Sequence, residues 1–568
     1  MPNLVLGPLL RYVGDTCAVV WVETDSACEI AVLGTTAQTF TVAGHHYAIV
    51  RAEGLEPAKR YEYTVELDGE QVWPLADSPF PPSSFRARPK PPPLRVSFGS
   101  CRVGVPHEEP YTLRKDDHDE GRELDPLRAL ALRMADEDPD SWPDLLLLLG
   151  DQVYADEVSP GTREFVEQRR DIDEEPGPIA LDFEEYTRLY RESWSDPVIR
   201  WLLSTVSSAM IFDDHDVHDD WNISAAWLEQ MRATDWWEEH IVGAIMSYWI
   251  YQHAGNLSPE EQDRDGLLQR CHEAGDAEQL LREFAHHSAH TTDGVRWSYH
   301  RDLDGTRLLV IDSRAGRQLP PEPIPPPAGH VTAGGASPPG GIRSMLDEEE
   351  WQWVSDQLDG DFDHVLLASS LPWLLAPGMH YLEAWSEAVC GGAWGRLAAR
   401  GGERIRQALD LEHWAAFEES FERLAELQRQ VGAGERGKPP ATIVTLSGDV
   451  HHAYLSEVAF RRGSGVESAV YQAVCSPLRN PLDKRERYAM RFAASRPAHA
   501  LMRGLARSAG VHDPSVRWRA LDDSPWFDNQ VASLKIDGRS NVMRLDKAVP
   551  GPTEHEPGLE RVLSRELA

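Results

Sequence analysis

A dense run of ionisable side chains lies at residues 211–221, where the sequence reads IFDDHDVHDDW. Five aspartates and two histidines follow a short apolar stretch. Carboxylates this close repel one another unless they reach water or meet a strong positive charge. The run therefore predicts either a solvated surface or a cation-binding site, and the other polar residues at strand ends bear on the choice.

A second candidate site follows five consecutive leucines, in the pentapeptide Gly150-Asp151-Gln152-Val153-Tyr154. The glycine permits a sharp turn out of a strand, which places Asp151 at the strand end with Tyr154 three residues further on. Anionic oxygen donors of these two types favour a hard, highly charged cation such as ferric iron. Taken alone, the pattern is equally typical of a capped turn with a partly buried tyrosine.

Two further strand-like runs end in residue types that bind metals. In SGDVHHAY, Asp449 and His451 are separated by one residue, so an extended backbone points both side chains the same way, toward a shared metal. In FGSCR, Cys101 precedes Arg102, whose planar guanidinium suits phosphate oxygens. Each residue has an ordinary structural explanation when taken singly, since a lone cysteine is usually a small buried hydrophobe. One metal centre explains them together.

Short apolar runs between long helical segments are expected to position these residues. Six runs have the length of a buried strand, and helices are expected between them, for example over residues 183–203 and 225–253. This alternation is typical of an α/β fold. Ligands bind such sheets beyond the carboxyl ends of the strands. The chemistry is therefore expected at Cys101, Asp151, residues 213–216, Asp312 and Asp449.

Residues 1–92 are predicted to form a small N-terminal β-sandwich. Over residues 61–67, tyrosines and aliphatic residues alternate with Glu and Thr before the turn pair Asp68-Gly69. Residues 54–63 resemble the corner of fibronectin type III domains, where a tyrosine ties the crossover back to the backbone. The proline-rich residues 78–93 are typical of a semi-rigid linker, which predicts a domain boundary near residue 92.

Two segments of the remaining chain stand apart. Residues 315–344 are rich in Pro and Gly and predict an excursion over the surface. From about residue 482 the chain predicts a helix over 494–508 and a strand pair split at 537–540. This C-terminal part either caps the site or completes a sheet.

Composition excludes several classes of protein. With 568 residues, 41% of them hydrophobic, the chain is expected to form two or three domains. A net charge of -37, from 56 Lys and Arg against 93 Asp and Glu, repels duplex DNA and anionic membrane surfaces. Six scattered cysteines form no disulfide framework. The start shows no export signal and no run approaches a membrane span, so we expect a cytoplasmic protein, of open oligomeric state.

Four motifs, FGSCR, LGDQVYAD, FDDHDV and SGDVHHAY, occur in this order over residues 98–454. Together they resemble the alkaline phosphatase D (PhoD-like) family of calcineurin-like metallophosphoesterases. The resemblance implies a four-layer α/β/β/α sandwich over residues 93–568, including the C-terminal extension, and two or more metal ions, iron plus calcium or other divalent metals. The ligands that it implies are Cys101, Asp151, Tyr154, Asp214, Asp449 and His451.

Within that centre, the resemblance implies that Asp151 bridges two metals and that Asp214 stands where the wider superfamily has an asparagine ligand. A separate histidine of the superfamily has no counterpart in residues 366–373, which offer only Ser369 and Ser370. One ligand is therefore unassigned.

The predicted reaction is hydrolysis of small-molecule phosphate mono- or diesters by a metal-bound hydroxide. His215 is the predicted general acid, Asp216 is expected to orient its ring, and Arg102, with Arg314 as a weaker candidate, is expected to contact the phosphate. Asp213, His218, Asp219 and Asp220 receive no role. The alternatives are a non-catalytic metal-containing binding protein, and a phosphodiesterase specialised for nucleotide or phospholipid diesters.

Overall fold

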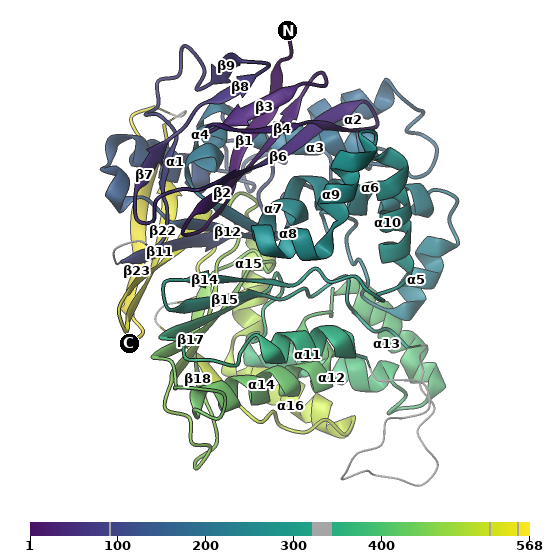
Figure 1. Ribbon diagram of the computed structural model, residues 1–568. Coiled ribbons are helices and arrows are strands. Elements are labelled where there is room, and N and C mark those ends of the chain that lie inside the picture. The colour runs from purple at the N-terminus through teal and green to yellow at the C-terminus, as the bar shows by residue number, and fades with distance from the viewer. Residues whose placement is uncertain (90–92, 321–342, 522–523, 554–555) are drawn as a thin grey trace.

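The computed structural model describes residues 1–89, 93–320, 343–521, 524–553 and 556–568 (Figure 1). The predicted boundary near residue 92 lies outside the described residues, and so does most of the segment 315–344. Within the described ranges, no helix is both long and apolar enough to cross a bilayer.

The N-terminal region consists of two antiparallel four-stranded sheets, with the orders β1-β2-β6-β5 and β4-β3-β8-β9, and a two-stranded ribbon, β10-β7. Val20, Val50 and Val65 belong to the apolar core that the two sheets enclose. The predicted β-sandwich is thereby confirmed. The strands are β1 (Leu4–Val13), β2 (Cys17–Thr24), β3 (Glu29–Val32), β4 (Thr35–Gln38), β5 (Phe40–Val42), β6 (His45–Glu53), β7 (Arg60–Glu62), β8 (Val65–Leu67), β9 (Glu70–Trp73) and β10 (Ser84–Arg86).

Two local features predicted for this region are present. Leu67 pairs with Glu70 across the turn at Asp68 and Gly69, which closes the β8–β9 hairpin. The backbone N–H of Glu56 donates a hydrogen bond of 2.6 Å to the hydroxyl of Tyr61. This is the tyrosine tie expected at the corner between strands.

Two larger sheets lie face to face in the rest of the chain. The first has the order β13-β12-β11-β21-β22-β23, with β11, β12 and β13 parallel. The second has the order β14-β15-β16-β17-β19-β18-β20, with β15, β16, β17 and β19 parallel. The strands are β11 (Leu94–Gly99), β12 (Leu145–Leu149), β13 (Ser208–Ile211), β14 (Tyr299–Leu303), β15 (Thr306–Val310), β16 (His364–Ala368), β17 (Thr442–Ser447), β18 (Tyr454–Ala459), β19 (Ala469–Val474), β20 (Arg517–Ala520), β21 (Gln530–Asp537), β22 (Ser540–Val549) and β23 (Gly558–Glu566).

Successive residues of the second sheet enter different cores, because side chains alternate along a strand. Leu308 and Val310 pack in the core between the two sheets, whereas Leu309 packs in a separate core outside them. The outer core also holds Trp351 of α11 (Glu348–Asp356) and Phe421 of α14 (Glu418–Gly432), and both helices cover that face of the sheet (Figure 1). On the other side α1 (Pro126–Asp136) packs on β21, β22 and β23. The predicted α/β/β/α layering is confirmed.

The predicted helices are shorter than their apolar patterns suggested. Residues 183–203 divide into α3 (Phe183–Trp194) and α4 (Pro197–Thr205), because Asp196 caps a new helix whose first residue is Pro197. Residues 225–253 divide into α5 (Ala225–Arg232), α6 (Trp237–Tyr248) and a π-helical turn at Trp249–His253. The other α-helices are α2 (Pro160–Glu167), α7 (Ala254–Asn256), α8 (Pro259–Asp265), α9 (Leu267–Ala274), α10 (Glu278–His290), α12 (Pro377–Cys390), α13 (Arg396–Ala408), α15 (Lys484–Ala493) and α16 (Arg496–Ser508).

The C-terminal strands complete the first sheet. β21 pairs with the central strand β11, and the β21–β22 hairpin turns at residues 537–540 as predicted. The sequence left open whether this segment caps the site or completes a sheet. Its strands complete a sheet.

His45 of β6 joins the N-terminal region to α3. Its two ring nitrogens lie 3.0 Å from Glu23 Oε1 and 2.8 Å from Glu184 Oε2. Partial burial lowers the pKa of His45, but the two carboxylates outweigh it and raise the pKa to about 9. Because the folded pKa lies above the unfolded value of about 6.5, this contribution to stability is complete below about pH 6.5 and is lost as the pH rises through about 9.

The His45→Gln variant is therefore expected to lose about 1–2 kcal/mol of unfolding free energy at pH 6 and little at pH 10. Urea unfolding of both proteins at the two pH values measures the difference. An equal loss at both values would show that the protonated imidazole contributes nothing.

Candidate metal centre

The carboxyl ends of the strands bring the predicted ligands together. Ligand atoms of Cys101 after β11, Asp151 after β12 and His451 after β17 lie within 4.8 Å of one another. Asp151 belongs to a second such group, with Asp214 and His215 after β13. A third group joins Asp214 to Asp213 and Asp449, and the hydroxyl of Tyr154 lies 3.5 Å from Asp151 Oδ2. All six predicted ligands thus lie in one connected cluster.

Four of these residues have an unusual backbone conformation. The φ angles of Cys101, Asp151, Asp449 and His451 are 59°, 52°, 65° and 50°. A non-glycine residue in this left-handed region costs about 1–3 kcal/mol, and such residues are concentrated at functional sites. The chain therefore accepts strain at the positions where the side chains converge.

Gly150 permits the close approach of two strand ends. Its φ is 103°, and a Cβ at this position would lie 2.5 Å from Cβ of Asp213. Any side chain here would push the loop of Asp213 and Asp214 away from Asp151. The glycine expected to turn the chain also brings the carboxylates together.

The donor set fits a bound cation. Asp151 is 1% exposed, and its Oδ1 has no hydrogen-bond partner among the described residues. Burial, together with the carboxylates of Asp214, Asp216 and Asp449, raises the pKa of Asp151 well above its usual range. A buried carboxylate oxygen without a donor is costly unless a cation meets it. Thiolate, phenolate, imidazole and carboxylate donors within a few ångströms supply the ligand types that such a cation needs.

Arg314 supplies positive charge beside the cluster. Its buried guanidinium makes ion pairs with Asp213 and Glu412, and it lies 3.1 Å from Asp214 Oδ1 and 3.4 Å from Asp449 Oδ1. Burial opposes the charge, yet these carboxylates raise the pKa of Arg314 well above its usual range. Arg314 was expected to contact phosphate. These ion pairs indicate instead that it holds the carboxylates of the predicted ligands in place.

Replacing Arg314 with Met is expected to destabilise the metal-free protein by about 3–5 kcal/mol, because buried carboxylates lose their partner. Added metal ions should recover part of the loss by neutralising the same carboxylates. Thermal unfolding with and without metal tests this. Arg102→Met, which breaks a buried ion pair outside the cluster, is the matched control and should destabilise the protein equally with and without metal. Equal metal sensitivity of both variants would contradict this role.

The expected brace of His215 is wrong. The residue that binds the ring is Asp156, whose Oδ1 and Oδ2 lie 2.9 and 3.0 Å from Nδ1 of His215. Asp216 instead accepts hydrogen bonds from the backbone N–H groups of residues 151–153 and 213, at 3.0–3.2 Å, and from the side chain of Gln252. Asp216 therefore ties two strand ends together, and these donors partly offset burial, which raises its pKa to about 7.

Arg102 also departs from its expected role. Its guanidinium pairs with the buried carboxylate of Asp125 at 2.8 Å and donates to the carbonyl of Ser193 at 2.8 Å. Both partners are buried, so Arg102 joins the loop after β11 to α1 and α3 and does not face the cluster as a phosphate contact. Asp312 likewise accepts from three backbone N–H groups of its own turn, at residues 314–316.

His413 is a site residue that sequence reasoning missed. Its Nε2 lies 2.9 Å from Asp449 Oδ2, and its Nδ1 lies 2.7 Å from the buried carboxylate of Glu383. Burial lowers the pKa of His413, but the two carboxylates outweigh this and raise it well above the usual range. No strand-like run precedes His413, so the pattern that located the other residues gave no signal here.

The residues of 211–221 without an assigned role differ in their surroundings. The N–H of Asp219 donates to Asp156 Oδ2 at 2.7 Å, and the N–H of Asp220 donates to Asp214 Oδ2 at 3.2 Å. Both therefore support side chains of the cluster through their backbone. Burial and nearby carboxylates raise the pKa of Asp219 to about 7 and of Asp220 to about 9. His218 packs against the ring of Trp236.

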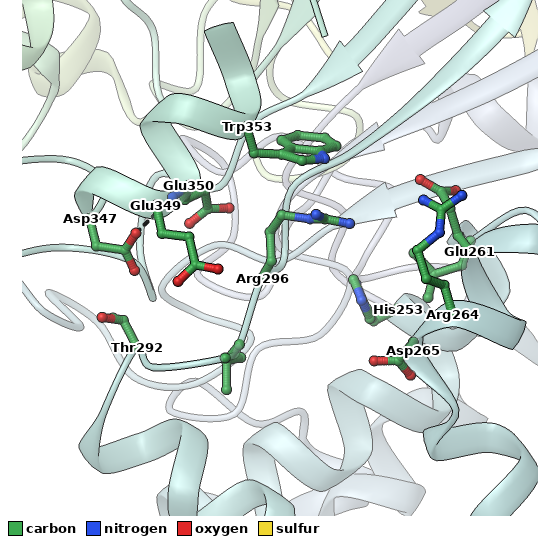
Figure 2. Close-up of a pocket in the computed structure, with 13 residues that line it drawn as sticks. His253, Glu261, Arg264, Asp265, Thr292, Arg296, Asp347, Glu349, Glu350 and Trp353 are labelled. Atoms are coloured by element: carbon green, nitrogen blue, oxygen red, sulfur yellow. Dashed lines mark hydrogen bonds between the residues drawn. The ribbon is translucent and has the colours of Figure 1, made fainter. Parts of the chain in front are cut away.

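A separate cavity of about 310 Å³ lies between α8, the loop at residues 292–296 and α11 (Figure 2). In it the guanidinium of Arg296 lies 4.2 Å from the ring of Trp353, and burial raises the pKa of Glu350 to about 8. None of its lining residues is a predicted ligand. This cavity is distinct from the metal centre.

The layered fold is of the metallophosphoesterase type, and the predicted ligands lie together at its strand ends. The predicted resemblance is supported over part of the chain: residues 130–281 match the family model described as PhoD-like phosphatase, and two of the four motifs lie in this range. Residues 1–85 match the model of a domain of unknown function (DUF7800).

One of two similar solved structures shares the fold. One described as "Structure of PhoD" has a TM-score of 0.57 and 14% identity, with 100% of this chain and 92% of that chain covered. A purple acid phosphatase, PPD1, from yellow lupin (Lupinus luteus) seeds has a TM-score of 0.47 and 10% identity, over 98% of this chain and 73% of that one. A search of the curated proteins found no significant match. The family match supports a metal-dependent phosphoester hydrolase acting on a small-molecule phosphate ester.

Proposed function

We propose that the protein hydrolyses phosphate mono- or diesters at the cluster formed by Cys101, Asp151, Tyr154, Asp214, Asp449 and His451, with iron plus calcium or other divalent metals as cofactors. The single observation that carries this proposal is the convergence of these side chains, from four strand ends, around Oδ1 of Asp151, which has no hydrogen-bond partner among the described residues.

The neighbouring contacts suggest how the ligands divide. Cys101, Tyr154 and Asp151 form the anionic set suited to ferric iron. Asp214 and Asp449 lie across the cluster beside Arg314, where oxygen donors suit calcium or another hard divalent ion. Asp151 stands between the two sets, since its ligand oxygens approach both Cys101 and Asp214. This supports the bridging role expected for Asp151.

We also propose His413 as the ligand that the sequence left unassigned. Metal-ligating histidines usually donate their second ring N–H to a carboxylate, which fixes the tautomer and the orientation of the ring. Glu383 meets Nδ1 of His413 in this way, while Nε2 approaches the predicted ligand Asp449.

When bound, two such cations polarise the phosphoryl oxygens and lower the pKa of a coordinated water towards neutrality. The chain itself provides the acid. Asp156 holds Nδ1 of His215, and the ring packs 4.8 Å from that of Tyr154, so Nε2 is the atom from which a proton reaches the leaving oxygen. Burial lowers the pKa of His215, but Asp156, Asp214 and Asp151 outweigh it and keep the imidazole protonated.

The test is to purify the protein without added metal, determine bound metals, and assay a chromogenic phosphate monoester and a diester. We expect bound metal and turnover of at least one ester, and the ratio of the two rates separates a monoesterase from an enzyme for nucleotide or phospholipid diesters. Bound metal with no turnover of either ester would favour the non-catalytic binding protein. Neither metal nor turnover, even after metals are added, would refute the proposal.

A further inference from the structure

Three metal-binding side chains meet on the surface away from the catalytic cluster. Glu238 lies in the first turn of α6, and His286 and His290 lie in the last turns of α10. The two helices pack side by side (Figure 1). Because residues four apart lie on the same face of a helix, both imidazoles face α6.

The distances between these side chains match a metal site. Nε2 of His286 lies 3.4 Å from Glu238 Oε1, and Nε2 of His290 lies 3.1 Å from Oε2. With bonds of about 2.0–2.1 Å to nitrogen and oxygen, the ligands of a tetrahedral zinc ion lie about 3.4 Å apart. One ligand atom from each residue lies within 4.8 Å of the others, so small side-chain rotations bring all three to one ion.

We propose that Glu238, His286 and His290 bind one divalent transition metal ion of the zinc type, with the fourth position open to water. Two imidazoles and one carboxylate are a ligand set that suits zinc. All three side chains are solvent-accessible, so an ion enters without any rearrangement of the fold. The site shares no residue with the catalytic cluster and does not depend on the proposed phosphatase reaction.

The site ties together helices that support the catalytic loop. His240 is buried and lies two residues after Glu238 on α6. Its Nε2 lies 2.8 Å from the carbonyl oxygen of Val217, and its Nδ1 lies 2.6 Å from the carbonyl oxygen of Ala180. Val217 lies two residues after His215, in the loop that carries Asp214 and His215. An ion between α6 and α10 therefore restrains the helix on which this loop rests.

The alternative is that no metal binds. In that case two ion pairs, from His286 and His290 to Glu238, hold the same three residues together. The two cases differ because an ion pair needs protonated imidazoles, whereas a metal binds them neutral. His287, between the two ligands in sequence, directs its Nε2 to the carbonyl oxygen of Asp293, 2.9 Å away. It is therefore a matched control on the same helix.

The test uses the full-length protein with its resident metals, dialysed at pH 8 against increasing Zn²⁺ and then analysed for zinc per chain. We expect the wild type and His287→Ala to bind one zinc more than the double variant His286→Ala/His290→Ala, at unchanged phosphatase activity. Equal zinc content in all three proteins would overturn the proposal. Zinc taken up by the catalytic centre cancels in this comparison.

A second measurement separates binding from misfolding. Saturating Zn²⁺ at about 100 times the dissociation constant lowers the unfolding equilibrium constant about 100-fold, so Zn²⁺ should raise the melting temperature of the wild type and of His287→Ala above that of the double variant. Glu238→Gln, which keeps the shape of the side chain, should weaken the zinc affinity at least about tenfold. An unchanged affinity in Glu238→Gln would contradict the proposed ligand set.

Discussion

Replacing Asp151 with Asn is expected to abolish both metal retention and phosphate ester hydrolysis. Asp151 contributes ligand atoms to two of the groups at the strand ends, and within the described part of the chain its buried Oδ1 has no hydrogen-bond partner. An amide oxygen carries no charge to neutralise a cation. Since the loss of a hydrogen-bonding neighbour of a ligand already costs about 10–100-fold in affinity or activity, the loss of a bridging ligand should cost more than about 100-fold.

Elemental analysis and an ester assay of the purified variant measure the two losses together. Asp312→Asn is the control, because that buried aspartate also follows a strand but its carboxylate accepts hydrogen bonds from the backbone of its own turn. It should retain metal and activity if it folds. An Asp151→Asn protein with full metal content and normal turnover would contradict the proposed centre.

Replacing His215 with Ala is expected to separate turnover from metal binding. A general acid contributes about 10²–10⁴ in rate, so turnover should fall by this factor while most of the metal is retained. Asp156→Asn removes the carboxylate that holds Nδ1 and should lower the rate less than His215→Ala does. Because the imidazole loses its charged partner, activity should also begin to decline at a lower pH than in the wild type.

The control for both variants is His218→Ala, since His218 lies three residues after His215 and its ring packs against Trp236. Its turnover should resemble that of the wild type. If His215→Ala loses metal in proportion to activity, His215 is a ligand and not the proton donor.

The sequence predicted the α/β fold class and the cluster at the strand ends because both depend on local patterns, whereas the four layers were implied by the family resemblance. Runs such as residues 145–149 identify buried strands, and the parallel pair β11 and β12 brings Cys101 and Asp151 to one edge of the first sheet. Asp449 follows β17 of the second sheet, at the end of its strand that lies beside this edge. Polar residues directly after such strands can be identified without knowledge of distant contacts.

Contacts between distant segments explain what the sequence did not predict. Asp216 was expected to hold His215 because it is adjacent in sequence, yet neighbouring side chains rarely face each other, and Asp156, 59 residues away, takes that place. Similarly, His413 reaches Asp449 from a loop with no strand pattern. Arginine is the residue type expected for phosphate binding. Only the fold shows that Arg102 and Arg314 form ion pairs with buried carboxylates instead.

The most direct test of the central claim is the phosphate ester hydrolysis of wild-type protein before chelation, after exhaustive chelation and after metals are restored. The proposed centre predicts activity in the first state, loss of that activity in the second, and recovery in the third for wild type but not for Asp151→Asn. Full activity after the last metal has been removed would contradict it.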